Sequence, residues 1–336
     1  MATARMVMTA KGKPAKTGAL SGTSTIATGT NPVGICISAD GSSVYAVNFG
    51  SNKVSIFARN TTTGALSGTS TIATGTGPSA ICISQDGSSV YAVNYYSNKV
   101  SIFARNTTTG ALSGTSTIAT GTNPYGICIS ADGSSVYAVN FGSNTVSIFA
   151  RNTTTGALSG TSTIATGTYP YGICISADGT SVYVANLLSN TVSIFSRNTS
   201  TGALSGTSTI ATGSNPYDVC VSADGNNVYA TNYSSNTVSI FARNTTTGAL
   251  SGTSTIATGG GPYGICISAD GTSVYTANTV PNTVSIFSRN TSTGALSGTS
   301  TIATGSTPYD VCVSADGNNV YSANYGSNTV SIFTRS

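Results

Sequence analysis

The chain alternates between short apolar runs and turns that are rich in Gly, Asn, Asp and Ser. In the first complete unit, the apolar runs cover residues 34–38, 44–47, 53–58 and 65–73. They are rich in β-branched and aromatic side chains, which is typical of β-strands rather than helices. The Asp-Gly pair after the first run favours a tight hairpin turn. The pattern therefore predicts four consecutive antiparallel strands, A to D, joined by three turns.

This four-strand unit occurs seven times with a period of 46 residues. One proline marks each copy: Pro32, Pro78, Pro124, Pro170, Pro216, Pro262 and Pro308. One cysteine keeps the same step: Cys36, Cys82, Cys128, Cys174, Cys220, Cys266 and Cys312. A period of about 40 to 50 residues is typical of β-propeller blades. We therefore predict an all-β, seven-bladed β-propeller of four-stranded antiparallel blades. A β-solenoid is the alternative, but it would need polar end caps that the sequence lacks.

The repeats do not begin or end at a blade boundary. The first copy begins with a D-like segment, residues 17–29, and the last copy ends after its C strand, residues 330–333. If the N-terminal segment supplies the missing D strand, it completes the last blade and closes the ring. Both faces of each blade should be apolar, because Val54 and Ile56 point to one face and Phe57 to the other.

Strand B and its flanks carry a recurring signature. Residues 182–186 read Val-Tyr-Val-Ala-Asn after an Asp-Gly pair, and residues 229–232 read Tyr-Ala-Thr-Asn. This signature resembles the YVTN-type repeat. The resemblance implies a seven-bladed propeller of the kind found in microbial surface-layer proteins, and hence an extracellular or cell-surface location. The repeat is also similar to the lactonase-like propellers grouped with phosphogluconolactonase and muconate cyclase, which are expected to use His, Glu and Arg in the central channel.

Charge separates the first 16 residues from the rest of the chain. The net charge of +4 comes from Arg5, Lys11, Lys13 and Lys16, and beyond them nine basic residues balance nine Asp. We expect residues 1–16 to form a basic flexible tail and residues 17–336 to form a single propeller domain. The neutral body argues against a nucleic-acid partner. Without a long apolar run or an apolar leader, we expect a soluble protein with no membrane span or signal peptide.

Few residue types are available for chemistry. The chain has no His, no Trp and no Glu, so acid–base catalysis would fall to Asp, Tyr, Lys or Cys. Seven Asp lie one per blade in the A–B turns, a spread that argues against a metal site, and nothing indicates a cofactor. We expect an Asp–Arg salt bridge with the Arg that ends strand C, repeated in each blade. The cysteines should be buried thiols without disulfides.

The differences between the copies form two main clusters, one around the proline and one in the B–C turn. In an up-and-down blade, the D–A and B–C connections emerge on the same face, which we call the top face. Variable loops on a rigid scaffold are where binding residues usually lie. Asp218 and Asp310 replace a small residue on strand A and would place negative charge near the channel mouth. The expected ligand-binding residues are Tyr125, Tyr171, Tyr217, Asp218, Tyr263, Tyr309 and Asp310.

These features lead us to expect a monomeric, non-enzymatic binding or scaffold propeller whose top face and channel mouth bind a glycan or a peptide. The near-identity of the copies indicates recent amplification or consensus design. One alternative is a lactonase-like hydrolase, which the missing His and Glu disfavour. The other is a structural repeat module without a ligand.

Overall fold

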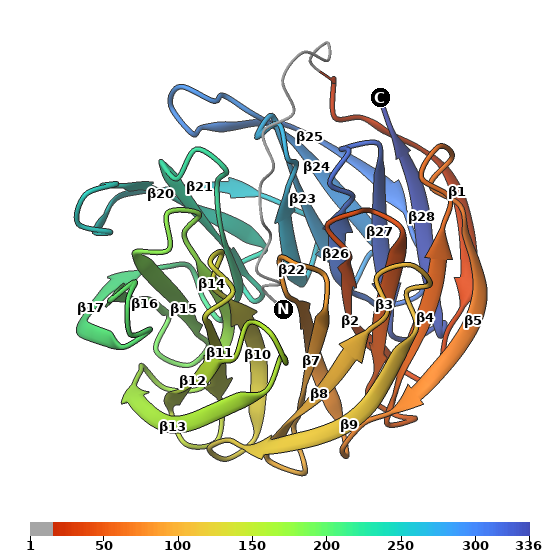
Figure 1. Ribbon diagram of the computed structural model, residues 1–336. Coiled ribbons are helices and arrows are strands. Elements are labelled where there is room, and N and C mark those ends of the chain that lie inside the picture. Colours follow the sequence, from red (N-terminus) through yellow and green to blue (C-terminus); the bar gives the residue numbers. More distant parts are fainter. Residues whose placement is uncertain (1–15) are drawn as a thin grey trace.

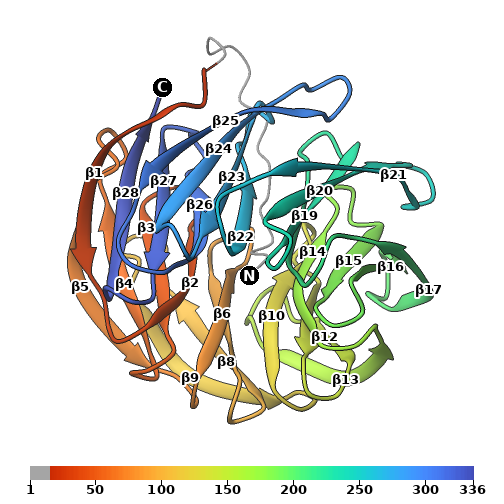
Figure 2. The same ribbon diagram turned by 180° about the vertical axis from the view of Figure 1, so that it is seen from behind.

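Seven four-stranded antiparallel sheets stand around one central axis in a computed structural model, which describes residues 16–336 (Figure 1). Figure 2 shows the same ring from behind. Between residues 16 and 336 the chain forms strands and turns and no helix, so this part holds no helix that could cross a membrane. The prediction of an all-β propeller with seven blades is confirmed.

Each blade contains four strands, A to D, and the A strands of neighbouring blades contact one another around the axis. Blades 1 to 3 comprise β2 (Pro32–Ile37), β3 (Ser43–Asn48), β4 (Lys53–Arg59), β5 (Leu66–Ala73); β6 (Pro78–Ile83), β7 (Ser89–Asn94), β8 (Lys99–Arg105), β9 (Leu112–Ala119); β10 (Pro124–Ile129), β11 (Ser135–Asn140), β12 (Thr145–Arg151), β13 (Leu158–Ala165). Blades 4 to 6 comprise β14 (Pro170–Ile175), β15 (Ser181–Asn186), β16 (Thr191–Arg197), β17 (Leu204–Ala211); β18 (Pro216–Val221), β19 (Asn227–Asn232), β20 (Thr237–Arg243), β21 (Leu250–Ala257); β22 (Pro262–Ile267), β23 (Ser273–Asn278), β24 (Thr283–Arg289), β25 (Leu296–Ala303). Blade 7 comprises β26 (Pro308–Val313), β27 (Asn319–Asn324), β28 (Thr329–Arg335) and β1 (Leu20–Ala27).

Blade 7 is assembled from both ends of the chain. Its sheet has the order β1-β28-β27-β26, so the N-terminal strand is its outermost strand. Just before β1, the amide of Gly18 donates to the carbonyl of Ser336 (2.9 Å), and the amide of Ser336 donates to the carbonyl of Ala19 (3.0 Å). The predicted ring closure is confirmed.

The strands begin and end within about two residues of the predicted runs. The largest difference is at strand A, which begins at Pro32 because Pro32 pairs with Asn48 across an irregularity in the ladder. A second irregularity interrupts the pairing of strands C and D between Ile56 and Ala58. There Gly68 has a φ of 62°, a conformation that glycine adopts without steric cost. The sequence pattern predicts neither irregularity.

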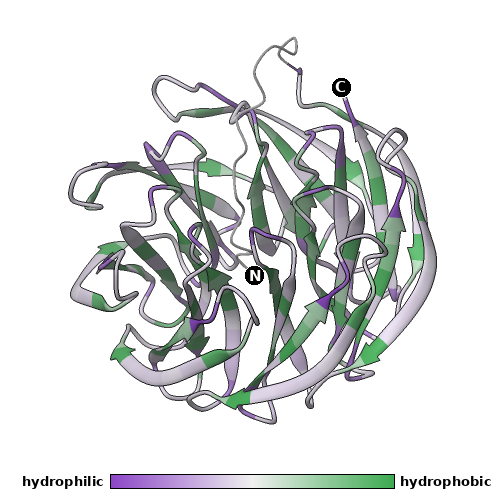
Figure 3. Ribbon diagram, viewed as in Figure 1, coloured by the Kyte–Doolittle hydropathy of each residue, from purple (hydrophilic) through white to green (hydrophobic). Residues whose placement is uncertain are grey.

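The core lies between neighbouring blades. Cys174 and Tyr183 of blade 4 pack against Val219 and Phe241 of blade 5 in one buried cluster. Alternate side chains along a strand therefore enter the layers on either side of the blade. Figure 3 shows the apolar positions recurring along the strands and the hydrophilic positions mainly in the turns. The apolar character predicted for both faces of the blades is confirmed.

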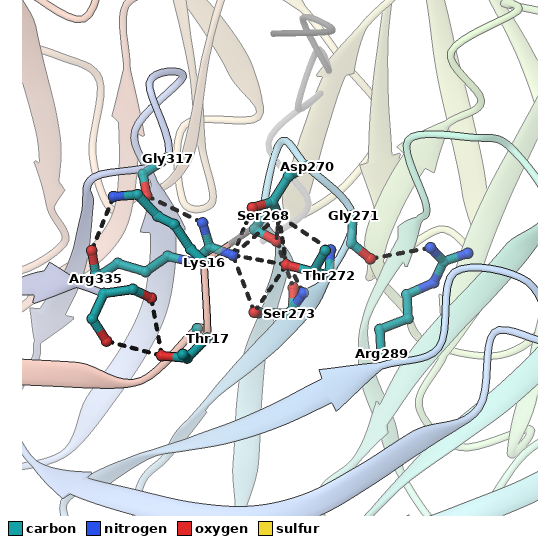
Figure 4. A network of polar contacts seen from close by, with 12 residues as sticks. Lys16, Thr17, Ser268, Asp270, Gly271, Thr272, Ser273, Arg289, Gly317 and Arg335 are labelled. Atoms are coloured by element: carbon teal, nitrogen blue, oxygen red, sulfur yellow. Dashed lines mark hydrogen bonds and ion pairs between the residues drawn. The ribbon is translucent and has the colours of Figure 1, made fainter. Parts of the chain in front are cut away.

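An arginine at the end of each C strand ties its blade to the preceding one. Arg335 of blade 7 donates through Nη2 to Asp270 Oδ2 and Thr272 Oγ1 of blade 6, both at 2.9 Å (Figure 4). Its Nε donates to the hydroxyl of Tyr275 in the same blade 6 (2.8 Å). Its Nη1 donates to the carbonyl of Gly317 in its own blade (3.3 Å).

Every Arg–Asp pair in the ring joins two neighbouring blades, with N–O distances of 2.8–3.1 Å. The predicted pairing of the Asp of the A–B turns with the Arg that ends strand C is confirmed, but each Arg pairs with the Asp of the preceding blade. The physical reason is that the guanidinium extends across the layer between blades, where the buried tyrosine of the preceding blade accepts its Nε–H.

Residues 1–15 of the predicted basic tail lie outside the described residues. Lys16 is described, and its ammonium donates to Asn318 Oδ1 (2.6 Å) and to the carbonyl of Arg335 (3.0 Å). The division of the chain at residue 16 stays a prediction.

Candidate functional site

The D–A and B–C turns of each blade meet at the top face. Next to blade 1, the amide of Phe49 donates to the carbonyl of Asn31 (2.8 Å), and the amide of Thr74 donates to the carbonyl of Asn52 (3.0 Å). The A–B turns, with their Asp–Arg pairs, lie at the other end of the strands. The two main clusters of variable positions are therefore gathered at the top face.

Two residues of the D–A turns have a backbone conformation that their side chains disfavour. The position before each strand A proline has a positive φ, and Asn or Gly occupies it in five blades. Tyr169 (φ 56°) and Thr307 (φ 52°) occupy it in the other two. The ring of Tyr169 stacks on Phe141 with the centroids 4.4 Å apart. Strained residues of this kind gather at functional sites, which supports a site on the top face.

Five tyrosines lie together at the top of the central channel. Each follows the proline of strand A, in blades 3 to 7, so the repeat brings all five to the axis at the same height. The centroid of the Tyr263 ring lies 4.1 Å from that of Tyr217 and 4.2 Å from that of Tyr309. The hydroxyls of Tyr171 and Tyr263 form a hydrogen bond of 2.5 Å. Tyr125 belongs to the same cluster.

A cavity of about 360 Å³ opens among these tyrosines. In blade 1 the equivalent of the tyrosine is Val33, and aromatic residues of the B–C turns complete the wall. The lining residues are Val33, Phe49, Tyr95, Tyr96, Tyr125, Phe141, Tyr171, Leu187, Tyr217, Tyr263, Tyr309 and Tyr325. All five tyrosines that the sequence indicated line it. The sequence interpretation left out the aromatic B–C residues, although their presence in a variable turn was a signal.

Burial keeps the phenols of this cavity protonated. It raises the pKa of Tyr125, Tyr171 and Tyr263 well above its usual value, and it also raises the pKa of Tyr217 and Tyr309. At neutral pH the tyrosines are therefore hydroxyl donors and not phenolates. An apolar wall with several O–H donors suits a ligand that has both C–H faces and oxygen acceptors.

Asp218 and Asp310 lie within the ring of A strands, and both are fully buried. Asp218 Oδ2 accepts the amide of Ile265 in the next blade (3.0 Å), and Asp310 Oδ2 likewise accepts the amide of Ile35 (3.0 Å). Each Oδ1 accepts the amide of the following residue in its own strand. The side chains point sideways between blades, because on strand A this position faces the neighbouring sheet.

The two carboxylates flank strand β22. Asp218 holds the amide of Ile265, while a Cβ added to Gly264 would lie 2.7 Å from Asp310 Oδ1. A Cβ added to Gly172 would likewise lie 2.7 Å from Asp218 Oδ1. Glycine in the preceding blade therefore provides the space for each aspartate. The structure thus brings both aspartates to the strands that carry Tyr217, Tyr263 and Tyr309, but it does not make them part of the cavity wall.

A second cavity, of about 270 Å³, lies at the opposite end of the channel. Its wall is formed by the ends of the A strands, including Ile37, Ile83, Ile129 and Ile175. The sequence interpretation missed it, since these positions are nearly the same in every blade and a search for variable positions passes over them.

All seven cysteines are buried, and none of them forms a disulfide. Burial raises the pKa of Cys36, Cys82 and Cys174 well above its usual value, so their thiols stay protonated. Within residues 16–336, no group of three or more His, Cys, Asp or Glu side chains is placed to hold a metal ion.

Comparison with protein families gives a match over most of the chain. The family described as "Lactonase, 7-bladed beta-propeller" matches residues 67–171, 162–266 and 261–336. The overlapping segments follow from the repeat, since one blade can align with several positions in the family. No curated protein matches the sequence significantly.

Solved structures with the same fold include two from Bacteroides that are provisionally assigned as 6-phosphogluconolactonases. The Bacteroides fragilis protein is 26% identical with a TM-score of 0.74, over 83% of this chain and 86% of that one. The Bacteroides uniformis protein is 25% identical with a TM-score of 0.73, over 82% and 86%. A periplasmic gluconolactonase of Pseudomonas aeruginosa is 19% identical with a TM-score of 0.73, over 82% and 86%, a likeness of fold.

These findings contradict the prediction of a non-enzymatic binding or scaffold protein. That prediction gave too much weight to the missing His and Glu. Phenol donors and carboxylates remain available for acid–base chemistry, and the fold collects both types of group near one end of the channel.

Proposed function

Since the chain belongs to the family of seven-bladed β-propeller lactonases, we propose that it hydrolyses a lactone in the tyrosine-lined cavity of the top face. The observation that carries the proposal is the family match over residues 67–336. The cavity of about 360 Å³ is the site at which we propose that the substrate binds. The ligand-binding residues proposed are the five tyrosines indicated by the sequence, Tyr125, Tyr171, Tyr217, Tyr263 and Tyr309. Asp218 and Asp310 lie behind this wall, and we propose a different role for them below.

The cavity suits a sugar lactone. Aromatic rings stack on the apolar C–H faces of a sugar ring, and a tyrosine hydroxyl of the wall can donate to its oxygens. The two Bacteroides proteins with the same fold are provisionally assigned to a sugar lactone, which supports this substrate class. A glycan or peptide ligand at the top face, as expected from the sequence, stays a prediction.

In the proposed reaction, water attacks the lactone carbonyl. A bond forms between the water oxygen and the carbonyl carbon, the ring C–O bond breaks, and the ring oxygen leaves as a hydroxyl after it takes up a proton. Negative charge develops on the carbonyl oxygen, where a tyrosine hydroxyl can stabilise it by donating a hydrogen bond. Such a donor contributes about 2.7–4 kcal/mol to the stabilisation of comparable transition states.

The attacking water must lose a proton to a base. The chain has no His and no Glu, so we assign this role to the carboxylate of an Asp. Among residues 16–336, Asp218 and Asp310 are the carboxylates outside the A–B turns at the far end of the strands. Because both are buried, we propose that a phenol or a water molecule relays the proton to them.

The test is the rate of hydrolysis of a six-carbon sugar lactone, followed by the acid it releases. We expect saturable hydrolysis above the spontaneous rate. Asp218→Gly and Asp310→Gly should lower kcat by about 100-fold, the usual contribution of a general base. Glycine stands at this position in four other blades, so these variants should fold.

Asp86→Asn, at the opposite end of the strands, is the matched control and should leave kcat unchanged. Hydrolysis by the wild-type protein at no more than the spontaneous rate would overturn the proposed function. Full activity in both glycine variants would overturn only the role proposed for the two aspartates and would leave the proposed lactone hydrolysis standing.

A further inference from the structure

The cavity of about 270 Å³ at the opposite end of the channel has no part in the proposed reaction. Branched aliphatic side chains form much of its wall, and each of them is the last residue of a strand A. They are Ile37, Ile83, Ile129, Ile175, Ile267 and Val313. Ile37, Ile83 and Ile175 are only partly buried. Concave apolar surface of this kind is typical of a ligand pocket. We call it the isoleucine-lined cavity.

The serines in the wall of this cavity already have hydrogen-bond partners. In blade 1 the hydroxyl of Ser38 donates to Asp40 Oδ1 (2.5 Å) and accepts the amide of Ser43 (3.0 Å). The same two bonds recur at the other serines of the wall, Ser84, Ser130, Ser176 and Ser314. Because a hydroxyl has a single proton, these serines leave the wall without a free hydroxyl donor.

Gln85 is the residue at which blade 2 differs from the other blades in this cavity. Gln85 lines the cavity and is half-buried. The other six blades have alanine at its position: Ala39, Ala131, Ala177, Ala223, Ala269 and Ala315. Within residues 16–336, the side-chain amide of Gln85 forms no hydrogen bond with the protein. A primary amide can both donate and accept, so the wall offers a ligand one free polar side chain.

The composition of the wall restricts the class of ligand. Among the described residues, no charged and no aromatic side chain lines the isoleucine-lined cavity. A charged ligand would lose its hydration there without an opposite charge to replace it. An apolar cavity of about 150 Å³ is large enough to bind benzene. The cavity of about 270 Å³ can therefore hold a neutral aliphatic molecule somewhat larger than benzene.

We infer that the isoleucine-lined cavity is a second ligand site, which binds a neutral, mainly aliphatic molecule that carries one carbonyl or hydroxyl group. The aliphatic part contacts the isoleucines, and the polar group forms a hydrogen bond with the amide of Gln85. The inference does not depend on the proposed lactone hydrolysis, because this cavity shares no lining residue with the tyrosine-lined cavity.

The experiment titrates the protein with cyclohexanecarboxamide, an aliphatic ring with one neutral amide, and follows the δ1-methyl NMR signals of isoleucine. No isoleucine of the described chain lines the tyrosine-lined cavity, so these signals distinguish the two sites. We expect saturable shifts at the isoleucines of this wall, Ile37, Ile83, Ile129, Ile175 and Ile267. Cyclohexanecarboxylate has the same shape with a negative charge and should bind at least about tenfold more weakly.

Two variants test the role of Gln85. Gln85→Ala gives blade 2 the residue of the other six blades and should raise Kd for cyclohexanecarboxamide about threefold to tenfold, as for the loss of one hydrogen bond. Gln85→Ala combined with Ala131→Gln moves the amide to the next blade of a nearly symmetric ring and should recover most of the affinity. Both residue types occur at this position in the chain, so both variants should fold.

Unchanged signals of all five isoleucines up to the solubility limit of cyclohexanecarboxamide would overturn the site. Equal Kd values for wild type and Gln85→Ala would overturn the hydrogen bond with Gln85. Equal affinity for the amide and the carboxylate would overturn the preference for a neutral ligand.

Discussion

At the scale of single residues, the D–A turn shows how one backbone position restricts the side chain. The residue before each strand A proline has a positive φ, which Asn and Gly adopt at little cost and which a β-branched residue disfavours. Thr307 meets this requirement against its own preference, with φ 52°. Its amide donates to Asn282 Oδ1 (2.7 Å), so the surrounding turns hold it in place.

Thr307→Asn should therefore stabilise the protein. We expect the free energy of unfolding to rise by about 0.5–1 kcal/mol, because the strain at this position is relieved. Thermal or urea unfolding measures the change. Asn123→Thr, at the equivalent position of blade 3, is the control and should lower stability by a similar amount. Equal stability of the wild-type protein and the two variants would show that the backbone at Thr307 is not strained.

At the scale of elements, the arginine that ends each C strand links neighbouring blades. Arg151 Nε donates to the Tyr91 hydroxyl (2.6 Å), Nη1 to the carbonyl of Gly133 (3.2 Å) and Nη2 to Asp86 Oδ2 (3.1 Å). The arginine side chain is 1% exposed, whereas that of Asp86 is 44% exposed. The link is therefore chiefly a set of buried hydrogen bonds from the guanidinium, with the ion pair as its solvent-facing part.

Arg151→Lys should destabilise the protein although it keeps the charge. A lysine cannot make the same three bonds, and the Tyr91 hydroxyl and the Gly133 carbonyl lose a partner. We expect a loss of about 2–4 kcal/mol in urea unfolding. Asp86→Asn should cost less than about 1 kcal/mol, because it weakens only the exposed part. An Arg151→Lys protein as stable as wild type would refute the account of the link.

The A–B turns make stability depend on pH in the acid range. Partial burial alone would raise the pKa of Asp40, but hydrogen bonds from Ser38 and Ser42 lower it to about 2. Asp86, Asp132 and Asp178 have a pKa of about 2 for the same reasons. An unfolded Asp has a pKa of about 3.9, so the folded protein binds these protons less readily than the unfolded chain.

The contribution of these carboxylates is present above about pH 4 and is lost as the pH falls toward 2. We therefore expect the free energy of unfolding to be flat from about pH 5 to 7 and to fall steadily below pH 4. Urea unfolding at a series of pH values measures it. In Asp178→Asn the slope below pH 4 should be smaller. A protein equally stable at pH 5 and pH 2.5 would rule the explanation out.

At the scale of the whole molecule, β1 of the N-terminal segment completes the last blade and joins both ends of the chain. It covers the edge of β28 that would otherwise be exposed along its length. Arg335 and Gly18 add to the closure, since the Tyr275 hydroxyl accepts from Arg335 Nε and donates to the carbonyl of Gly18 (both 2.8 Å).

Deletion of residues 17–29 should therefore lower the melting temperature and promote association through the exposed edge of β28. A circularly permuted chain, which begins at residue 30 and carries residues 17–29 after Ser336, should recover the melting temperature and the elution volume of the wild-type protein. Melting curves and size-exclusion chromatography distinguish the two. A deletion variant with the melting temperature and the elution volume of wild type would show that β1 does not hold the ring.

Much of the fold could be predicted from the sequence, because the repeat presents each strand signal seven times in the same order. The partner of each arginine could not be predicted from the sequence. Since the copies are nearly identical, a pairing of Asp40 with Arg59 in its own blade and one with Arg105 in the next look alike in sequence. The positions of the tyrosines at the axis followed from the blade order, but the burial of Asp218 and Asp310 depends on how closely neighbouring A strands approach.

The function was predicted less well, because the missing His and Glu pointed away from catalysis. Family membership rests on the pattern of the whole repeat and does not depend on those two residue types. The cavity likewise depends on side chains from seven blades, and no single segment of the sequence contains it.

The most direct test of the account is a crystal structure of the protein with a lactam analogue of a six-carbon sugar lactone, which cannot be hydrolysed. We expect the ring to lie against Tyr217, Tyr263 and Tyr309, with its carbonyl oxygen within hydrogen-bonding distance of a tyrosine hydroxyl. An analogue bound only in the cavity beside Ile37 and Ile83 at the opposite end of the channel, or not bound at all at saturating concentration, would contradict it.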